Sequence, residues 1–296
     1  MRIGARGFSA IAALILRGLI SWGLILWGGI LAPGPAAGQA PPSDTATSAA
    51  WNPPRLPDGQ PDVQGMWITA VNAVFILTPA VTDDGAPRPD GRARQSGPSR
   101  VIDPPDHQIP YQPWAKEKQQ RLQANKDGEG EFVDPQIRCL PSPIRGAFWQ
   151  DFQILQYPGY IIFEYEGNHV FRIIPLDDRP HASNRIKLWM GDSRAHWEGT
   201  TLVVDETNMN SKGRLSREGD FASETLHLTE RYTFLDSKKM HYEATFDDPT
   251  VYTRPWKIGA DFIPKRAPAG YEQWEEACHE GERDAALSDL NLSSKK

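Results

Sequence analysis

The stretch Glu224–Asp247, ETLHLTERYTFLDSKKMHYEATFD, contains two runs in which apolar and polar side chains alternate. Alternation with a period of two is typical of a β-strand that buries one of its faces. The two runs are separated by Asp236, Ser237 and Lys238, which are residues that favour a turn. The stretch therefore predicts two antiparallel strands joined by a short connection.

Further apolar runs of strand length lie on both sides of this hairpin, and turn signals separate most of them. Short connections favour pairing between strands that are neighbours in the sequence. The expected strand regions are residues 65–77, 153–166, 169–176, 186–190, 200–207, 224–235, 239–247 and 252–263. We therefore predict a mainly β fold, an antiparallel meander that closes into a lipocalin-like barrel or a strongly curved sheet.

One short helix is expected before the main block of strands. Residues 114–125, WAKEKQQRLQAN, are mostly strong helix formers, and Pro113 stands where a helix can begin. With helical periodicity, Trp114, Lys118 and Leu122 are expected to face the body of the protein.

The remaining segments predict a single domain with long N-terminal loops. The predicted barrel domain covers residues 65–283, and residues 284–296 are expected to form a flexible tail. Residues 41–64 are rich in Pro, Ser and Asp and predict a tether. Residues 78–113 are dense in Pro, Gly, Asp and Arg, and we expect them to form a long surface loop.

The first forty residues have the layout of a secretory signal peptide. Two arginines precede an apolar segment, and small residues follow it up to Ala37 and Ala40, the two expected cleavage sites. Arg17 interrupts the apolar run and leaves the part behind it short of the ~20 residues that a membrane span needs. We therefore predict a periplasmic or secreted protein that loses residues 1–40 and keeps no stable membrane span.

The charge of the chain argues against one class of partner. The sequence has 32 basic and 38 acidic residues, a formal net charge of −6 at pH 7. Loss of the predicted signal peptide removes arginines and no acidic residue, so the exported protein is still more acidic. Because an acidic protein repels the phosphate backbone, nucleic acid is not expected as a partner.

Two cysteines, Cys139 and Cys278, flank most of the predicted strands. An oxidising compartment permits a disulfide between them, and this is our first expectation. Two buried free thiols are the alternative that the sequence leaves open.

Aromatic, acidic and histidine residues are concentrated in the stretch Leu188–Asn210, LWMGDSRAHWEGTTLVVDETNMN. Its glycines predict a turn between a short strand and the β-branched run that follows. Such a hairpin gathers Asp192, His196 and Glu198 at one end, where we expect them to line the mouth of the barrel. Trp197 is expected to anchor the hairpin in the core.

Alternation in the strand at 224–235 places Glu230 on the apolar face. A carboxylate turned into an apolar interior needs a cation, hydrogen-bond donors or a raised pKa, and each marks a candidate functional group. Arg172 is the expected partner, because it lies on the same face of its strand as Val170 and Ile174. Glu230 therefore either fixes the register of the barrel through an ion pair or acts as a general base.

Motifs for the commoner cofactors are missing from the sequence. No group of His, Cys, Asp or Glu has the spacing of a zinc site with a third ligand. There is no phosphate-binding glycine loop, no dinucleotide fingerprint and no Gly-x-Ser-x-Gly nucleophile motif. We therefore expect neither a metal nor an organic cofactor.

Several segments resemble a family of exported bacterial proteins of unknown function. They are CLPSPIRG, ILQYPGYIIFEYEGNHVFRII, WMGDSRAHWEGTTLVVDETNMN, ERYTF, ATFDDPTVYTRPW and ACHEG, and the resemblance extends over residues 53–282. The segments WEGTTLVVDETN and DPTVYTRPW are the most specific. The resemblance implies a β-rich, lipocalin-like barrel and brings no activity with it. Cys139 is followed here by Leu-Pro-Ser-Pro, which departs from the Cys-x-Pro-x-Gly expected of the family.

Three functions are compatible with these observations. The first is a barrel that binds a small hydrophobic or aromatic molecule in an apolar cavity. The second is a cofactor-independent lyase (hydratase or dehydratase) or isomerase with Glu230 or Glu198 as general base, and the third is an envelope interaction protein. The candidate ligand-binding residues are His169, Arg172, Trp197, Tyr252 and Trp256. The candidate catalytic residues are Glu230, Glu198, His196 and Asp192.

Overall fold

The computed structural model describes most of the chain between residues 51 and 273. The described residues are 51–70, 77–78, 99–126, 130–140, 142, 144, 151–167, 170–266 and 270–273. All of them belong to the second of two units into which the chain divides, Met1–Ala46 and Thr47–Lys296. The predicted signal peptide and tail, His169 and Cys278 lie outside the described residues.

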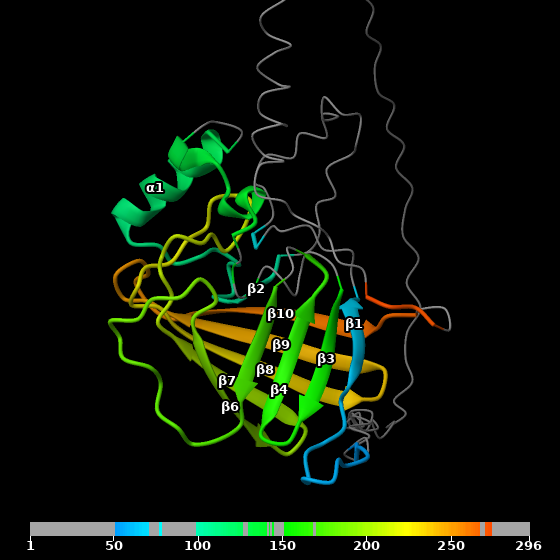
Figure 1. Ribbon diagram of the computed structural model, residues 1–296. Coiled ribbons are helices and arrows are strands. Elements are labelled where there is room, and N and C mark those ends of the chain that lie inside the picture. The colour runs from blue at the N-terminus through cyan, green and yellow to red at the C-terminus, as the bar shows by residue number, and fades with distance from the viewer. Residues whose placement is uncertain are drawn as a thin grey trace, which may run out of the picture. The chain divides into compact units, whose positions relative to one another are not determined.

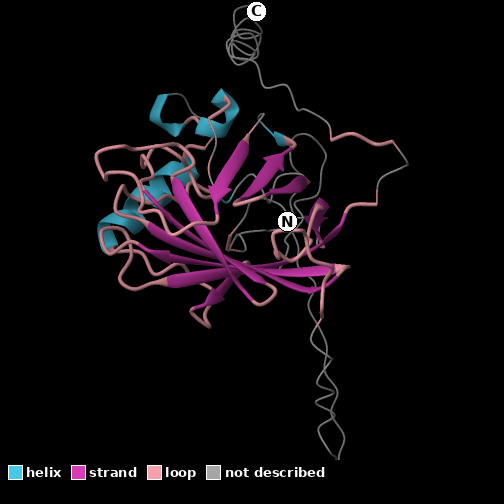
Figure 2. Cartoon of the chain, turned by 60° about the horizontal axis from the view of Figure 1, so that its bottom comes forward, coloured by secondary structure: helices cyan, strands magenta, loops and turns pink. Residues whose placement is uncertain are grey.

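Nine strands form one antiparallel sheet in the order β5-β4-β3-β1-β10-β9-β8-β7-β6, and β2 pairs with β10 beside this path. In the part of the chain that the structure describes, no ladder joins β5 to β6, although these two ends of the path lie next to each other. The sheet is therefore nearly closed into a barrel with one seam (Figure 1 and Figure 2), which confirms the predicted fold class. The strands are β1 Gly65–Thr69, β2 Val101–Asp103, β3 Phe152–Tyr157, β4 Tyr160–Tyr165, β5 Phe171–Pro175, β6 Asp192–Glu198, β7 Thr201–Thr207, β8 His227–Asp236, β9 Lys239–Asp247 and β10 Trp256–Pro264.

Strand β1 joins the two blocks of consecutive strands. Strands β6 to β10 pair in sequence order, and so do β3 to β5, as the short turns between most of them predicted. On one side of β1, Trp67 lies opposite Pro264 of β10, and on the other side it lies opposite Phe152 of β3. Strand β1 therefore joins the block of β3 to β5 to the block of β6 to β10.

The hairpin of β8 and β9 has the two faces that the alternation predicted. Tyr232 lies opposite Tyr242, and Glu230 lies opposite Ala244. All four side chains are buried in the interior. The outward residues between them, such as Arg231, are partly exposed. The alternation therefore identified the inward face of both strands correctly.

The region between β5 and β7 differs from the prediction. Residues 186–190, expected as a strand, contribute a single isolated bridge, from Leu188 to Met209. The expected turn is itself strand β6, which alternates polar outward residues with Ser193, Ala195 and Trp197. The turn between β6 and β7 takes only Gly199, at a φ of +65°, and Thr200. Strand β6 escaped prediction because its polar face and its neighbouring glycines imitate a loop.

Helix α1, Pro113–Ala124, confirms the predicted helix and, in part, the face expected to meet the body. Leu122 is buried together with Ala115 and Gln119, and Gly219 approaches it so closely that an added Cβ would lie 2.7 Å from the Cβ of Leu122. Trp114 is 48% exposed but packs against Phe221 with a centroid distance of 6.0 Å, and Lys118 Nζ lies 4.1 Å from the centroid of the same ring. Two 3-10 helices follow, η1 Gly130–Phe132 and η2 Pro135–Arg138. No helix in the described ranges has the length and apolar character that a membrane span requires.

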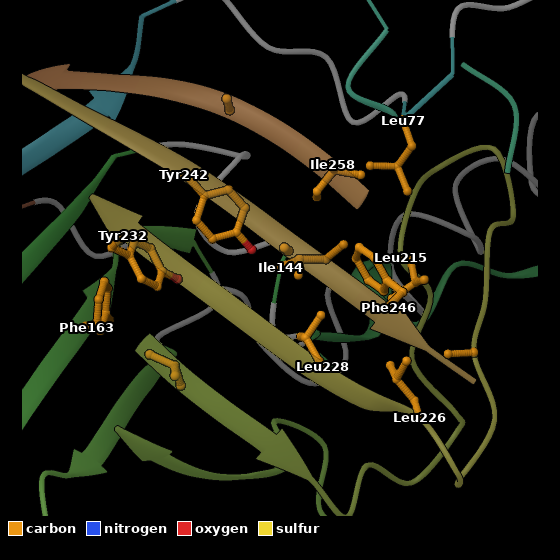
Figure 3. Packing of buried hydrophobic residues seen from close by; sticks show 14 of the residues in the cluster. Leu77, Ile144, Phe163, Leu215, Leu226, Leu228, Tyr232, Tyr242, Phe246 and Ile258 are labelled. Carbon is orange, nitrogen blue, oxygen red and sulfur yellow. The ribbon is translucent and has the colours of Figure 1, made fainter. Parts of the chain in front are cut away.

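The interior of the barrel is lined by aromatic and aliphatic side chains. Figure 3 shows Phe163, Tyr232 and Tyr242 lying together, apart from a second group that includes Leu226 and Phe246. The ring of Tyr232 lies 4.9 Å from that of Phe163 and 4.9 Å from that of Tyr242, measured between centroids. The first group forms the apolar surroundings of the polar cluster described next.

Candidate functional site

A buried ionic cluster lies inside the barrel and is centred on Arg172 of β5. Its Nη2 atom donates hydrogen bonds to Glu206 Oε2 at 2.6 Å, to Glu230 Oε2 at 2.6 Å and to Ser193 Oγ at 3.2 Å. These acceptors come from β7, β8 and β6 in turn. We call these four residues, together with Tyr232 and Tyr242, the arginine cluster. The predicted pairing of Arg172 with Glu230 is confirmed.

Glu230 has a donor at each of its carboxylate oxygens. Oε1 accepts hydrogen bonds from the hydroxyls of Tyr232 and Tyr242, both at 2.9 Å, while Oε2 faces Arg172. Burial, followed by the charge of Glu230, raises the pKa of both tyrosines well above the ordinary value of 10. The two hydroxyls therefore keep their protons and act as donors, which compensates the desolvation of a carboxylate that is 1% exposed.

Glu206 is the second carboxyl group on the same guanidinium. Its pKa is raised to about 8 as the net result of burial, which raises it most, the charge of Arg172, which lowers it, and the charge of Glu230, which raises it. At neutral pH the Glu206 carboxyl is therefore mostly protonated beside the guanidinium of Arg172. A buried carboxyl whose pKa is raised by burial and by a specific charged neighbour is a recurrent feature of functional sites.

Several polar atoms of the cluster lack hydrogen-bond partners of normal geometry among the described residues. They are Arg172 Nε and Nη1 and Glu206 Oε1, all of which are buried. The Tyr165 hydroxyl lies close enough for Arg172 to lower its pKa, but burial dominates and raises this pKa to about 12. Each unpaired buried donor or acceptor costs roughly 1–3 kcal/mol of stability. In the described part of the chain, three such atoms lie together in this cluster.

The backbone is fitted closely around Glu206. Gly191, which precedes β6, has a φ of +69°, and a Cβ there would lie 2.6 Å from Glu206 Oε1 and 2.8 Å from the carbonyl oxygen of Thr207. A side chain at position 191 therefore cannot coexist with this position of the carboxyl group. The glycine that seemed to mark a turn is required by the cluster.

The structure does not bring Asp192, His196 and Glu198 together as predicted. They share the outer face of β6, where Asp192 pairs with Thr207 at one end and Glu198 with Thr201 at the other. The side chains of His196 and Glu198 are 61% and 49% exposed. Glu198 accepts from Arg231 at 2.7 Å and lies 3.3 Å from His196 Nε2. The three residues do not lie at one end of a hairpin, because the stretch expected to form a turn is the extended strand β6.

Asp192 instead holds the segment that follows β5 against the outside of β6. Its Oδ2 accepts from the Ala182 N–H at 2.7 Å and lies 3.0 Å from His181 Nδ1, and its Oδ1 accepts from Arg194 at 2.7 Å. Burial raises the pKa of Asp192, but these partners outweigh it and hold the pKa below its usual range. His181 Nε2 lies 3.0 Å from Asp205 Oδ2 on β7. We call residues 179–183 the outer strap.

The other predicted ligand-binding residues lie apart from the arginine cluster or outside the described residues. Trp197 is half-buried, packs against Phe234 with a centroid distance of 6.1 Å and so anchors β6 in the core. Tyr252 donates to the carbonyl of Phe221 at 2.7 Å. Trp256 is fully buried and stacks on Phe246 at 4.2 Å. Of the predicted set, only Arg172 joins the cluster, and the position of His169 is not described.

A smaller ionisable group lies where β3 begins and where β4 and β10 end. Lys265 forms an ion pair with Asp151 and donates to the Tyr271 hydroxyl at 2.6 Å. Burial, followed by the proximity of Asp151, raises the pKa of Glu166 to about 7. No periodic pattern in the sequence predicts this group, because its members lie at strand ends.

Neither a metal site nor the predicted disulfide is established. Among the described residues, no group of three or more His, Cys, Asp or Glu side chains is placed to hold a metal ion. Cys139 follows η2 and ends it in the left-handed region, at a φ of +59°. Since Cys278 lies outside the described residues, the disulfide between the two stays a prediction.

Comparisons with protein-family models, with curated proteins and with solved structures find no match for the chain. The resemblance to a family of exported bacterial proteins therefore stays a prediction, and the chemistry of the site has to be argued from its own geometry.

Proposed function

We propose that this protein is an exported binding protein for a small molecule with an apolar or aromatic body, and that the arginine cluster recognises the polar group of that molecule. The observation that carries the proposal is a set of buried polar atoms inside an aromatic barrel that have no hydrogen-bond partner of normal geometry among the described residues, namely Arg172 Nε, Arg172 Nη1 and Glu206 Oε1. Small-molecule sites commonly combine apolar walls with a few polar groups that fix orientation.

The chemistry of the cluster specifies the polar group. Arg172 Nε and Nη1 are donors only, so they favour an acceptor such as a carbonyl or carboxylate oxygen. Glu206, protonated at neutral pH, supplies one further donor and one acceptor. The rings of Phe163, Tyr232 and Tyr242 are fully buried in this interior, and an aromatic body that enters beside the cluster would pack against them. A flat aromatic carboxylic acid or ketone fits this description.

The test compares molecules that share an apolar body and differ in the polar group. Naphthalene, 2-naphthol and naphthalene-2-carboxylate are titrated against the full protein while tryptophan fluorescence and heat are recorded. We expect saturable binding that is strongest for the carboxylate. The variant Arg172→Lys, which keeps the charge and loses the planar donors, is expected to bind the carboxylate at least about tenfold more weakly, a change of about 1.4 kcal/mol.

Arg231→Lys is the matched control, because Arg231 lies on the outer face of β8 and pairs with the exposed Glu198. Circular dichroism and thermal unfolding establish that both variants are folded. Absence of saturable binding by all three molecules contradicts the proposal, and so does an equal loss of affinity in the two variants.

Acid–base catalysis is the second candidate, and the raised pKa of Glu206 favours it. A carboxyl that is protonated near neutral pH can act as a general acid, and the neighbouring Glu230 can accept a proton when its donors move. This pair replaces Glu198 and His196, which lie on the outside of the barrel. The discriminating variant is Glu206→Gln, for which a lyase or isomerase loses turnover while a binding protein retains ligand.

A further inference from the structure

The barrel is interrupted at one place, the seam between β5 and β6. Each other pair of neighbouring strands along the path is joined by a backbone ladder, whereas the described residues of β5 and β6 share none. What holds the two edges together is a set of side chains and the segment that follows β5. The seam is therefore the part of the wall that opens with the smallest loss of backbone hydrogen bonds.

Inside the barrel, one side chain spans the seam. Arg172 belongs to β5, and its three acceptors, Ser193, Glu206 and Glu230, belong to β6, β7 and β8 on the other side. All four side chains are buried. Separation of the two edges breaks these contacts and admits water to a site whose pairing depends on its exclusion.

Outside the barrel, the outer strap crosses from the end of β5 onto β6 and β7. Arg194 donates to the carbonyl oxygens of Arg179 at 3.3 Å and Pro180 at 3.1 Å. His181 lies between Asp192 and Asp205, 3.0 Å from each. The strap is held by polar contacts at the surface, which exchange readily with water.

We propose that the seam between β5 and β6 is the gate to the interior and that the proton on Glu206 controls its opening. As a route for ligands the gate rests on the proposed function, but its opening is a property of the protein alone. When the seam is closed, the contacts of the arginine cluster are intact. When it is open, Glu206 is exposed to water.

The charges around Glu206 set the direction of the control. Arg172 faces it from β5, and Asp192 and Glu230 contribute negative charge from β6 and β8. The hydroxyls of Tyr232 and Tyr242 in the cluster, and that of Tyr165 beside it, stay protonated because their pKa values are raised. Loss of the Glu206 proton thus leaves two buried carboxylates on a single guanidinium, with the carboxylate of Asp192 nearby.

Proton linkage turns this arrangement into a prediction for pH. A solvated Glu206 titrates near its ordinary pKa of 4.5, whereas in the closed barrel its pKa is about 8. Opening therefore releases a proton between these two values, and the opening equilibrium rises by up to about tenfold per pH unit. Above about pH 8 the dependence ends, because Glu206 is ionised in both states.

Thiol labelling of two inward alanines tests the gate without any ligand. Ala195 lies on β6 at the seam and is 5% exposed, whereas Ala260 lies on β10, in the middle of the strand path, and is 8% exposed. The variants Ala195→Cys and Ala260→Cys are reacted with N-ethylmaleimide, and the parent protein supplies the background from its own cysteines. Global unfolding exposes both positions equally, so the ratio of their labelling rates isolates the seam.

We expect Ala195→Cys to be labelled faster than Ala260→Cys, with a ratio that rises toward pH 8 and then levels. Adding Glu206→Gln removes this pH dependence, while Glu218→Gln, at a buried glutamate near α1, preserves it. Equal labelling rates of the two cysteine variants at every pH contradict the gate. A ratio of the rates that still depends on pH when Glu206→Gln is present contradicts control of the gate by the proton on Glu206. Ile174→Cys, at a buried position on β5, the other edge of the seam, replaces Ala195→Cys if the latter does not fold. If the labelling results are as expected but none of the three naphthalene compounds binds, the proposed binding function is refuted and the gate is retained.

Discussion

Arg172 on β5 and Glu230 on β8 meet inside the barrel with Nη2 and Oε2 2.6 Å apart, although neither their strands nor their sequence positions are adjacent. The pair crosses the seam where the sheet is not closed by backbone hydrogen bonds. One contact therefore serves both the closure of the barrel and the polar chemistry of its interior.

Removal of the guanidinium is expected to destabilise the fold strongly. Arg172→Met leaves Glu206 and Glu230 buried without a cation, and loss of one partner of a buried ion pair typically costs about 3–5 kcal/mol. Urea unfolding measures the change in the free energy of unfolding. Arg231→Met, at a partly exposed ion pair, serves as control and should lose much less. Equal losses contradict a central role for Arg172.

The stability of the fold is expected to depend on pH because the pKa of Glu206 is raised in the folded protein. Its pKa is about 8 in the folded protein and near 4.5 when solvated, so its stabilising contribution is complete below pH 4.5 and is lost as pH rises to about 8. The free energy of unfolding of the wild type, relative to that of Glu206→Gln, is expected to fall by up to about 1.4 kcal/mol per pH unit in this interval. Chemical denaturation at a series of pH values measures it, and a flat or rising difference refutes the raised pKa.

The hydroxyl of Tyr232 is expected to contribute through Glu230. Tyr232→Phe removes one of the two hydroxyl donors to Oε1, and a hydrogen bond to a charged group is typically worth about 1.5–3 kcal/mol. Thermal and urea unfolding measure the loss. Tyr157→Phe is the matched control, since Tyr157 is 55% exposed, and it should leave stability unchanged. If both variants behave alike, the hydroxyl is not part of the cluster.

A comparison of alanine variants at Gly191 and Gly199 distinguishes the cost of steric contact from the cost of backbone strain. Gly191→Ala and Gly199→Ala both place a side chain at positive φ, which costs roughly 1–2 kcal/mol. A Cβ at Gly199 meets open space, whereas one at Gly191 meets Glu206 and Thr207. Overpacking at Gly191 is expected to add about 1–3 kcal/mol, measured by urea unfolding of the two variants. Equal losses show that Glu206 does not lie against residue 191.

Much of the fold and one half of the cluster follow from alternation in the sequence. The period of two in the strand at 224–235 places Glu230 inside, and the same rule places Arg172 inside its own strand. Because both lie on inward faces, they can meet in the interior, while the arrangement of the strands decides that they do. The order in which β1 joins β10 to β3 depends on pairing between strands far apart in the sequence, which periodicity does not encode.

The same alternation with a period of two places Glu206 on an inward face, but Glu206 is not among the predicted site residues. It continues the inward series of Leu202 and Val204, and all three are completely buried. Its signal is obscured because the polar residues between Gly191 and Gly199 are typical of a turn, so that the apolar run at Thr200–Val204 carries the clearer strand pattern. The outer strap gave no local signal, since the contacts of His181 with Asp192 and Asp205 exist only after β6 and β7 have paired.

The most direct test of the central claim is the ¹⁵N–¹H resonance of Arg172 Nε, assigned by its loss in Arg172→Lys. This N–H is buried and has no hydrogen-bond acceptor of normal geometry among the described residues, so a bound acceptor must change its chemical environment. We predict that saturating naphthalene-2-carboxylate shifts this resonance, while naphthalene shifts it less. A resonance that stays unchanged when the carboxylate is bound places the ligand elsewhere and contradicts recognition by the arginine cluster.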